Sequence, residues 1–307
     1  MDLASKTINP RSGIRISRRP QQGFTLIELI IVITLTGIVA SMISTITSHQ
    51  MAAYIDMSAR ANLVNLAEAS LRRISRDLHN AVPNSVRVSG SSLEFVPVAA
   101  AGRYRSAPSA TAGSNYLDIS TLDDSFQVLG NLTQPASGSR LVIYNFGWVD
   151  GSGPVAGSNL YGSVSSGTLS PAGSHVISPS GNDITVTDNG VNDLVTLDSA
   201  FQFSFNSPNK RFFVINGAAS YVCDTGLGQI NRYAGYGIQS SQPTNGAVAP
   251  LSSAASSALL VDHVESCSFS YAPGTTERKG IVTIMLTLID NGERVRLINQ
   301  VHVSNRS

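Results

Sequence analysis

Residues 18–37 read RRPQQGFTLIELIIVITLTG, and this stretch decides how the rest of the chain is arranged. A basic start leads into an apolar run from Phe24 to Ile46, 23 residues in which Glu28 is the sole charge. At about 1.5 Å per residue, a helix of this length covers the roughly 30 Å hydrocarbon core of a bilayer. The stretch therefore predicts a membrane-spanning helix over residues 24–46.

The distribution of charge predicts the orientation of that helix. The 307-residue chain has a formal charge of +1, but residues 1–23 carry +4 and residues 24–307 carry −3. Basic flanks stay in the cytoplasm, so we expect the C-terminal part to lie across the membrane. No basic face is evident beyond the start, which gives a nucleic-acid partner no support. Charged residues make up only 13% of the chain, a composition that favours a β-rich, loop-rich exported domain.

Glu28 needs an explanation, because a carboxylate in a membrane helix costs roughly 2.5–3.5 kcal/mol and normally marks a function or a partner. Two plainer interpretations stand beside that one. The carboxylate could reach the interface, which lies one helical turn away. Alternatively, the run could be a secretory signal cut near the weak small-residue site at 38–41, although this would leave Glu28 without a purpose.

The residues Gly23-Phe24-Thr25-Leu26-Ile27-Glu28-Leu29, after a basic leader and before an apolar helix, resemble the class III signal of type IV prepilins and type II secretion pseudopilins. The resemblance implies that a prepilin peptidase cuts between Gly23 and Phe24 in the cytoplasm and then methylates the new amine of Phe24. Gly23 suits this step because it has no side chain to obstruct a protease cleft. Glu28 would then pair with the Phe24 amine of a neighbouring subunit, since each charge compensates the other in a low dielectric.

The helix is expected to continue beyond the membrane. Residues 47–81 contain no proline or glycine and repeat with a helical period, in Met51, Ile55, Leu63, Leu66, Ser70, Ile74 and Leu78. Three pairs of opposite charge at i,i+4 add local support, namely Asp56 with Arg60, Glu68 with Arg72, and Arg73 with Asp77. Pro83 disfavours helical geometry before it, so the helix should end near Ala81. We expect an amphipathic continuation over 47–82 and a head over 83–307.

The sequence of the head predicts an antiparallel sheet. A hairpin is predicted at 86–88 and 93–96, and a second at 281–289 and 294–303, whose Asn291-Gly292 pair favours a type I′ turn. Residues 259–271 should add a strand beside the second hairpin. Other strand candidates are 116–120, 126–129, 140–146, 183–187, 194–197, 201–205, 211–216 and 220–223. Stretches rich in Gly, Ser, Ala and Pro at 99–115, 147–182 and 239–258 predict long loop insertions.

Two kinds of candidate site remain in the head. Cys223 and Cys267 have no CxxC or Cys/His pattern around them, so an exported domain favours one disulfide, with two buried thiols as the alternative. Asp188 and Asp193 cluster oxygen ligands and are a weak calcium candidate, but the spacing of an EF-hand is missing and a turn at Asn189-Gly190 is favoured. No motif for a zinc site, a nucleotide cofactor or a catalytic nucleophile is present, so we expect neither a cofactor nor an enzyme.

Further blocks narrow the resemblance. Residues 73–78, 81–87, 93–97, 210–214, 232–237 and 301–305 resemble the MshO-type minor pilin of the mannose-sensitive haemagglutinin (MSHA) pilus. The resemblance implies an α+β pilin fold, in which a long N-terminal helix packs on an antiparallel sheet. It also implies a minor pilin of the bacterial inner membrane, with its head in the periplasm and a final place in the pilus, expected at the tip. Partners would be the peptidase, the major and other minor pilins, and the inner-membrane assembly platform. The alternatives are a minor pseudopilin of type II secretion and a tip adhesin.

Overall fold

The computed structural model describes residues 23–108, 115–162, 175–275 and 278–305, so the expected leader at 1–22 lies outside the described residues. One long helix precedes an antiparallel, strand-rich domain, which confirms the predicted α+β class and is consistent with a pilin fold. The chain divides into two compact units, residues 1–55 and residues 56–307.

Helix α1 spans Leu26–His79 and belongs to both units. It begins two residues after the predicted start and ends two residues before the predicted end. The early end has a local cause, because Ala81 forms an isolated β-bridge with Pro97 and the Val82 amide donates to the Val96 carbonyl at 2.8 Å. The chain thus enters the sheet before Pro83, not at it.

In the first unit, the α1 side chains are exposed, and their hydroxyl groups bond to the helix itself. The Thr34 hydroxyl donates to the Ile30 carbonyl at 3.0 Å, and the Thr36 hydroxyl donates to the Val32 carbonyl at 2.7 Å. A hydroxyl group in hydrocarbon is costly unless it is hydrogen-bonded, so these contacts let the threonines lie in an apolar helix. The apolar run can therefore face lipid or other helices on every side.

In the second unit, α1 packs against the sheets. Its buried side chains are Leu63, Ala67, Ser70, Leu71, Ile74 and Leu78. The predicted helical face was right from Leu63 onward except at Leu66, which is 42% exposed, whereas Met51 and Ile55 are exposed and lie outside this core. The reason is that strands line the helix only along its last turns, so an apolar period alone does not say where packing begins.

The predicted charge pairs of α1 are only partly present. Arg72 and Glu68 form an ion pair, as expected. Asp77 instead accepts from Arg232 Nε and from the Tyr221 hydroxyl, both at 2.7 Å. Among the described residues, no ion pair joins Arg73 to Asp77 or Asp56 to Arg60. The predicted Arg73–Asp77 pair was wrong, because a tertiary contact with the sheet replaces it.

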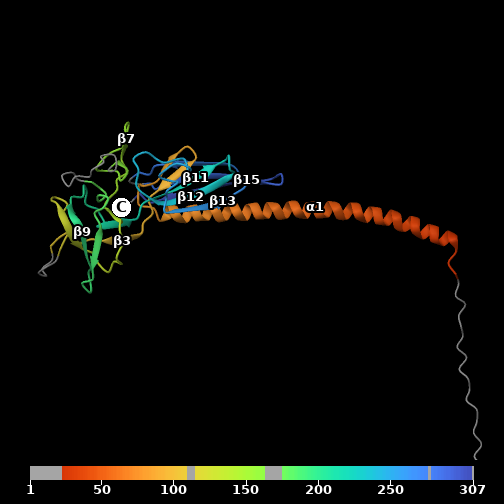
Figure 1. Ribbon diagram of the computed structural model, residues 1–307, viewed down its shortest axis with the longest axis horizontal. Helices are drawn as coiled ribbons and strands as arrows, with labels where there is room; N and C mark the ends of the chain where they lie inside the picture. The colour runs from red at the N-terminus through yellow and green to blue at the C-terminus, as the bar shows by residue number, and fades with distance from the viewer. Residues whose placement is uncertain (1–22, 109–114, 163–174, 276–277, 306–307) are drawn as a thin grey trace, which may run out of the picture. The chain divides into compact units, whose positions relative to one another are not determined.

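Two sheets line the helix. The five-stranded sheet has the order β1-β2-β11-β12-β13, and these strands are Arg87–Ser89, Ser92–Phe95, Ala218–Asp224, Gln229–Tyr236 and Ser256–Val261. The second has the order β14-β15-β16, with strands Val264–Ala272, Gly280–Asp290 and Glu293–Val303. Side chains of both sheets share one core with α1, including Phe95, Tyr221 and Ile284. Figure 1 shows β11, β12, β13 and β15 gathered as one group.

The rest of the head forms a second group around another core. One sheet has the order β3-β10-β5, with strands Ala100–Arg103, Arg211–Ile215 and Arg140–Val142. Another has the order β4-β9-β8, with strands Asp123–Gln127, Leu194–Phe201 and Ile184–Thr187. The short strands β6 and β7, Val149–Asp150 and Gly153–Pro154, pair with each other. A third cluster joins the two groups, since it contains Ile215 of β10 and Tyr236 of β12.

Both predicted hairpins are confirmed. Strands β1 and β2 pair across Gly90, and β15 and β16 pair from Gly280↔Val303 to Asp290↔Glu293. Asn291 and Gly292 have φ values of 48° and 86°, the left-handed pair that a type I′ turn requires.

Other strand predictions need correction. No strand forms at 116–120, because the Asp118 carboxylate accepts from the Ser120 amide and the Asp118 amide donates to Asp123, so local bonds replace a ladder. The candidate at 194–197 lies within β9. The candidate at 201–205 was wrong beyond Phe201, the last residue of β9, because Phe203 makes only an isolated bridge with His175. The expected strand at 259–271 is two, β13 and β14, separated at His263, which has a φ of 58°. Strand β3 lies inside the expected loop 99–115, and β12 was not predicted.

Candidate functional site

The bond between Gly23 and Phe24 lies outside the helix. Residues 23–25 are not helical, and the Phe24 side chain is 83% exposed. A Cβ added at Gly23 would meet no atom within 4 Å. Inside a helix, the carbonyl and amide of a peptide bond are held by hydrogen bonds, whereas this bond is open to a protease cleft.

Thr25 caps the helix that follows this bond. The Glu28 amide donates to the Thr25 hydroxyl at 3.3 Å, and the Leu29 amide donates to the Thr25 carbonyl at 3.2 Å. This cap was missed from the sequence, although Thr25-x-x-Glu28 is the spacing of a capping box. The cap fixes where the helix begins, so it keeps the Gly23–Phe24 bond in non-helical chain.

Glu28 lies in the first turn of α1 and is exposed. An acidic group is favourable there, because the first helical amides carry a partial positive charge. Within the described chain, no basic side chain forms an ion pair with Glu28. Its carboxylate is therefore available to a cation from outside the chain.

The apolar side chains after Glu28 are also available. Leu29, Ile30, Ile31, Val32 and Ile33 are between 48% and 60% exposed. The described chain holds one helix long and apolar enough to cross a membrane, and this is α1. The first unit thus offers an apolar helix, one acidic group near its start and an open peptide bond before it.

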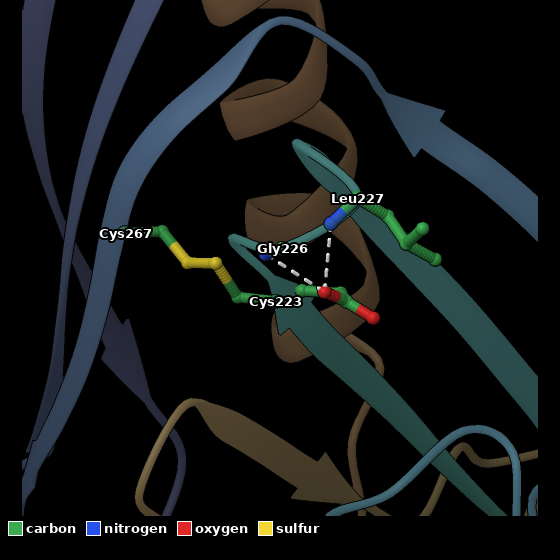
Figure 2. Close-up of a disulfide and its surroundings, with 5 residues drawn as sticks. Cys223, Gly226, Leu227 and Cys267 are labelled. Carbon is green, nitrogen blue, oxygen red and sulfur yellow. Dashed lines mark hydrogen bonds between the residues drawn. A yellow bond between two sulfur atoms is a disulfide. The ribbon is translucent and has the colours of Figure 1, made fainter.

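The cysteines lie on different sheets and form a disulfide. Cys223 is on β11 and Cys267 is on β14, with their Cα atoms 6.5 Å apart. Figure 2 shows the bond beside the turn at Gly226 and Leu227, whose amides both donate to Asp224 at 2.9 Å. The disulfide ties the five-stranded sheet to the β14-β15-β16 sheet.

The two aspartates of the calcium candidate make different local contacts. Asp188 accepts from the Gly190 amide at 2.7 Å, which forms the expected turn. Asp193 is buried and accepts from the Leu132 amide at 2.6 Å. Within the described ranges, no three His, Cys, Asp or Glu side chains gather as metal ligands.

One family model matches the chain. It is described as the prokaryotic N-terminal methylation motif and covers residues 18–44. The chain thus carries the motif of prokaryotic type IV pilin-like proteins, which implies processing by a prepilin peptidase, pilin partners in general and anchoring in the inner membrane. No curated protein and no solved structure matches the chain.

Proposed function

We propose that this protein is a minor pilin that helps to initiate or cap a type IV pilus. The observation that carries the proposal is the methylation motif at 18–44, with the Gly23–Phe24 bond open just before the capped helix. A large head with its own cores also supports it, because a head of this size can form specific contacts with other minor pilins.

The proposed chemistry has two steps. A prepilin peptidase cleaves after Gly23 and methylates the Phe24 amine, which remains cationic. The exposed carboxylate of Glu28 on another subunit then pairs with that amine inside the apolar helix layer. Each charge is costly alone in hydrocarbon and favourable once paired, so the pair selects one stagger between neighbouring helices.

Among minor pilins, we propose the MshO-type subunit of an MSHA-like pilus, on the resemblance of blocks such as 73–78 and 232–237. The head would lie in the periplasm and then at the pilus tip, after contact with the inner-membrane assembly platform. A minor pseudopilin of type II secretion shares the same motif and is the competing assignment. Deleting the protein separates them, since loss of surface pili supports the proposal and loss of protein export alone contradicts it.

A head at the pilus tip could instead serve adhesion, which is the alternative to a role in assembly. A deletion strain that assembles normal pili but no longer adheres would replace the assembly role with an adhesive one.

The pairing step is tested with Glu28→Gln. This variant should still be cleaved, because Gly23 and Phe24 are unchanged, but its incorporation into pili should fall at least about tenfold, as expected when a charge-assisted contact is lost. The matched control is Glu68→Gln, which removes an exposed carboxylate from the same helix and should incorporate normally. Normal incorporation of Glu28→Gln would contradict the pairing step.

A further inference from the structure

Arg87 and Arg140 each line a cavity of the head, and they differ in how their charge is satisfied. Arg87 donates from Nε to Glu94 at 2.5 Å, and its other two nitrogens donate to the carbonyls of Ser240 and Gln239. Its guanidinium also lies 3.6 Å from the centre of the Tyr161 ring. Each nitrogen of Arg87 thus has a partner, and Glu94 balances its charge.

Arg140, the first residue of β5, has no such balance. Its Nε donates to the Ser178 carbonyl at 2.7 Å, and among the described residues its two terminal nitrogens have no partner. No described carboxylate forms an ion pair with it. Burial lowers the pKa of Arg140 to about 10, the direction expected of a cation without a counter-charge.

Arg140 lines a cavity of about 230 Å³ where the β3-β10-β5 sheet meets the five-stranded sheet. Of the residues that line it, Arg140 alone carries a charge, and four are glycines, Gly138, Gly217, Gly235 and Gly237. Such walls allow a ligand to approach the backbone closely. The cavity is smaller than a site for a drug-sized molecule, so it suits a small group.

Packing accounts for two of these glycines and not for a third. A Cβ at Gly217 would lie 2.6 Å from the Tyr236 carbonyl oxygen, and one at Gly235 would lie 2.9 Å from Ala255 Cβ. At Gly237, a Cβ would meet only Gln239 Nε2, at an ordinary 3.7 Å, and the backbone is not left-handed. The fold would therefore accept a side chain at position 237, which lines the cavity.

We propose that the cavity around Arg140 binds the carboxylate group of a small acidic ligand, either an organic acid or an acidic sugar. The two terminal nitrogens of a guanidinium match the two oxygens of a carboxylate in a planar, bidentate pair. One carboxylate also neutralises one arginine, whereas a phosphate group, with a charge near −2, would leave an excess in a site with a single cation. His175 does not supply a second one, because burial and then the charge of Arg140 lower its pKa.

The test uses the full chain in detergent micelles, titrated with sodium acetate and sodium glucuronate against sodium chloride at equal ionic strength. Binding is measured by calorimetry and by the melting temperature of the head. We expect one or both acids to bind and to raise the melting temperature. Glucuronate binding more tightly than acetate indicates a sugar ligand, and equal binding indicates recognition of the carboxylate alone. No response to either acid would overturn the proposal.

Variants separate the site from general anion binding. Arg140→Met should raise the Kd at least about tenfold, the loss expected for a charged hydrogen-bonding partner. Arg140→Lys should bind with intermediate strength, because lysine keeps the positive charge but cannot form the planar, bidentate pair with a carboxylate. The matched control Arg211→Met removes an exposed arginine of the adjoining strand β10 and should leave binding unchanged. Equal binding by Arg140→Met and the native chain would contradict the proposal.

Two further results guard against a purely structural role for Arg140. Without acid, Arg140→Met should melt no lower than the native chain, since it removes an unbalanced cation; a clearly lower melting temperature would make Arg140 a structural residue. If that variant does not fold, Gly237→Leu adds a bulky side chain to the lining of the cavity and leaves Arg140 in place. It should fold and lose acid binding, and retained binding would contradict the proposal.

Discussion

The two halves of α1 are parts of one helix, yet different surroundings stabilise them. Residues 26–55 expose apolar side chains such as Ile33 and Leu35, so lipid or neighbouring subunits must cover them. Residues 63–78 bury Leu63, Ile74 and Leu78 against the two sheets of the head. The difference shows that a helical repeat of apolar residues can form either an assembly surface or part of a core. Only the packing of the rest of the chain decides between the two.

The largest expected effect comes from a change at the proposed cleavage site. Gly23→Leu places a branched side chain beside the bond to be cut, so cleavage should be lost and the precursor should keep its leader. Immunoblotting and mass spectrometry of membranes would measure the processed fraction. The control is Gly37→Ala, a change within the helix where an added Cβ meets no atom within 4 Å, and it should be processed normally. Full processing of Gly23→Leu would show that the peptidase cuts at a different position.

The second prediction contrasts the two halves directly. Leu78→Ala should lower the free energy of unfolding of the head by about 2–5 kcal/mol, because it leaves a cavity in a packed core. Leu35→Ala removes the same atoms from a side chain that is 57% exposed and should leave the melting of the head unchanged. Thermal unfolding of the full chain in detergent micelles measures both, and equal effects would mean that the halves do not differ as described.

The third prediction concerns the link between the sheets. Replacing both Cys223 and Cys267 by alanine should lower the free energy of unfolding by about 2–4 kcal/mol, since the disulfide constrains the unfolded chain. A reductant should destabilise the native chain similarly and leave the variant unaffected. A native chain that melts identically with and without reductant would show that the disulfide does not stabilise the head.

The smallest effect is a pH dependence. Burial, and then the charge of Arg140, lower the pKa of His175, and its Nδ1 atom is buried without a hydrogen-bond partner among the described residues. The folded head therefore binds this proton less readily than the unfolded chain does. Its stability should be full above the usual histidine pKa of about 6.5 and should fall as the pH drops below it. His175→Gln should reduce the fall in melting temperature at low pH. An unchanged dependence of melting temperature on pH would show that other groups cause the fall.

The structure of the N-terminal half of α1 was largely predictable, because the residues that determine it are close together in the sequence. The apolar run gave the helix, and the capping signal of Thr25 was present in the sequence although it was overlooked. The head was less predictable because its contacts join distant residues. Asp77 pairs with Arg232 instead of the neighbouring Arg73, and strand β12 has a polar sequence that becomes a strand because β11 and β13 flank it. The Arg140 cavity depends on two sheets meeting, which no single stretch of sequence reveals.

The most direct test of the central account is the intact mass of the protein recovered from its own cells. If residues 18–44 work as a processing and methylation signal, the mature chain begins at Phe24 and carries one methyl group on its amine. A chain that keeps residues 1–23, or one that begins within the apolar run near residue 41, would contradict the account.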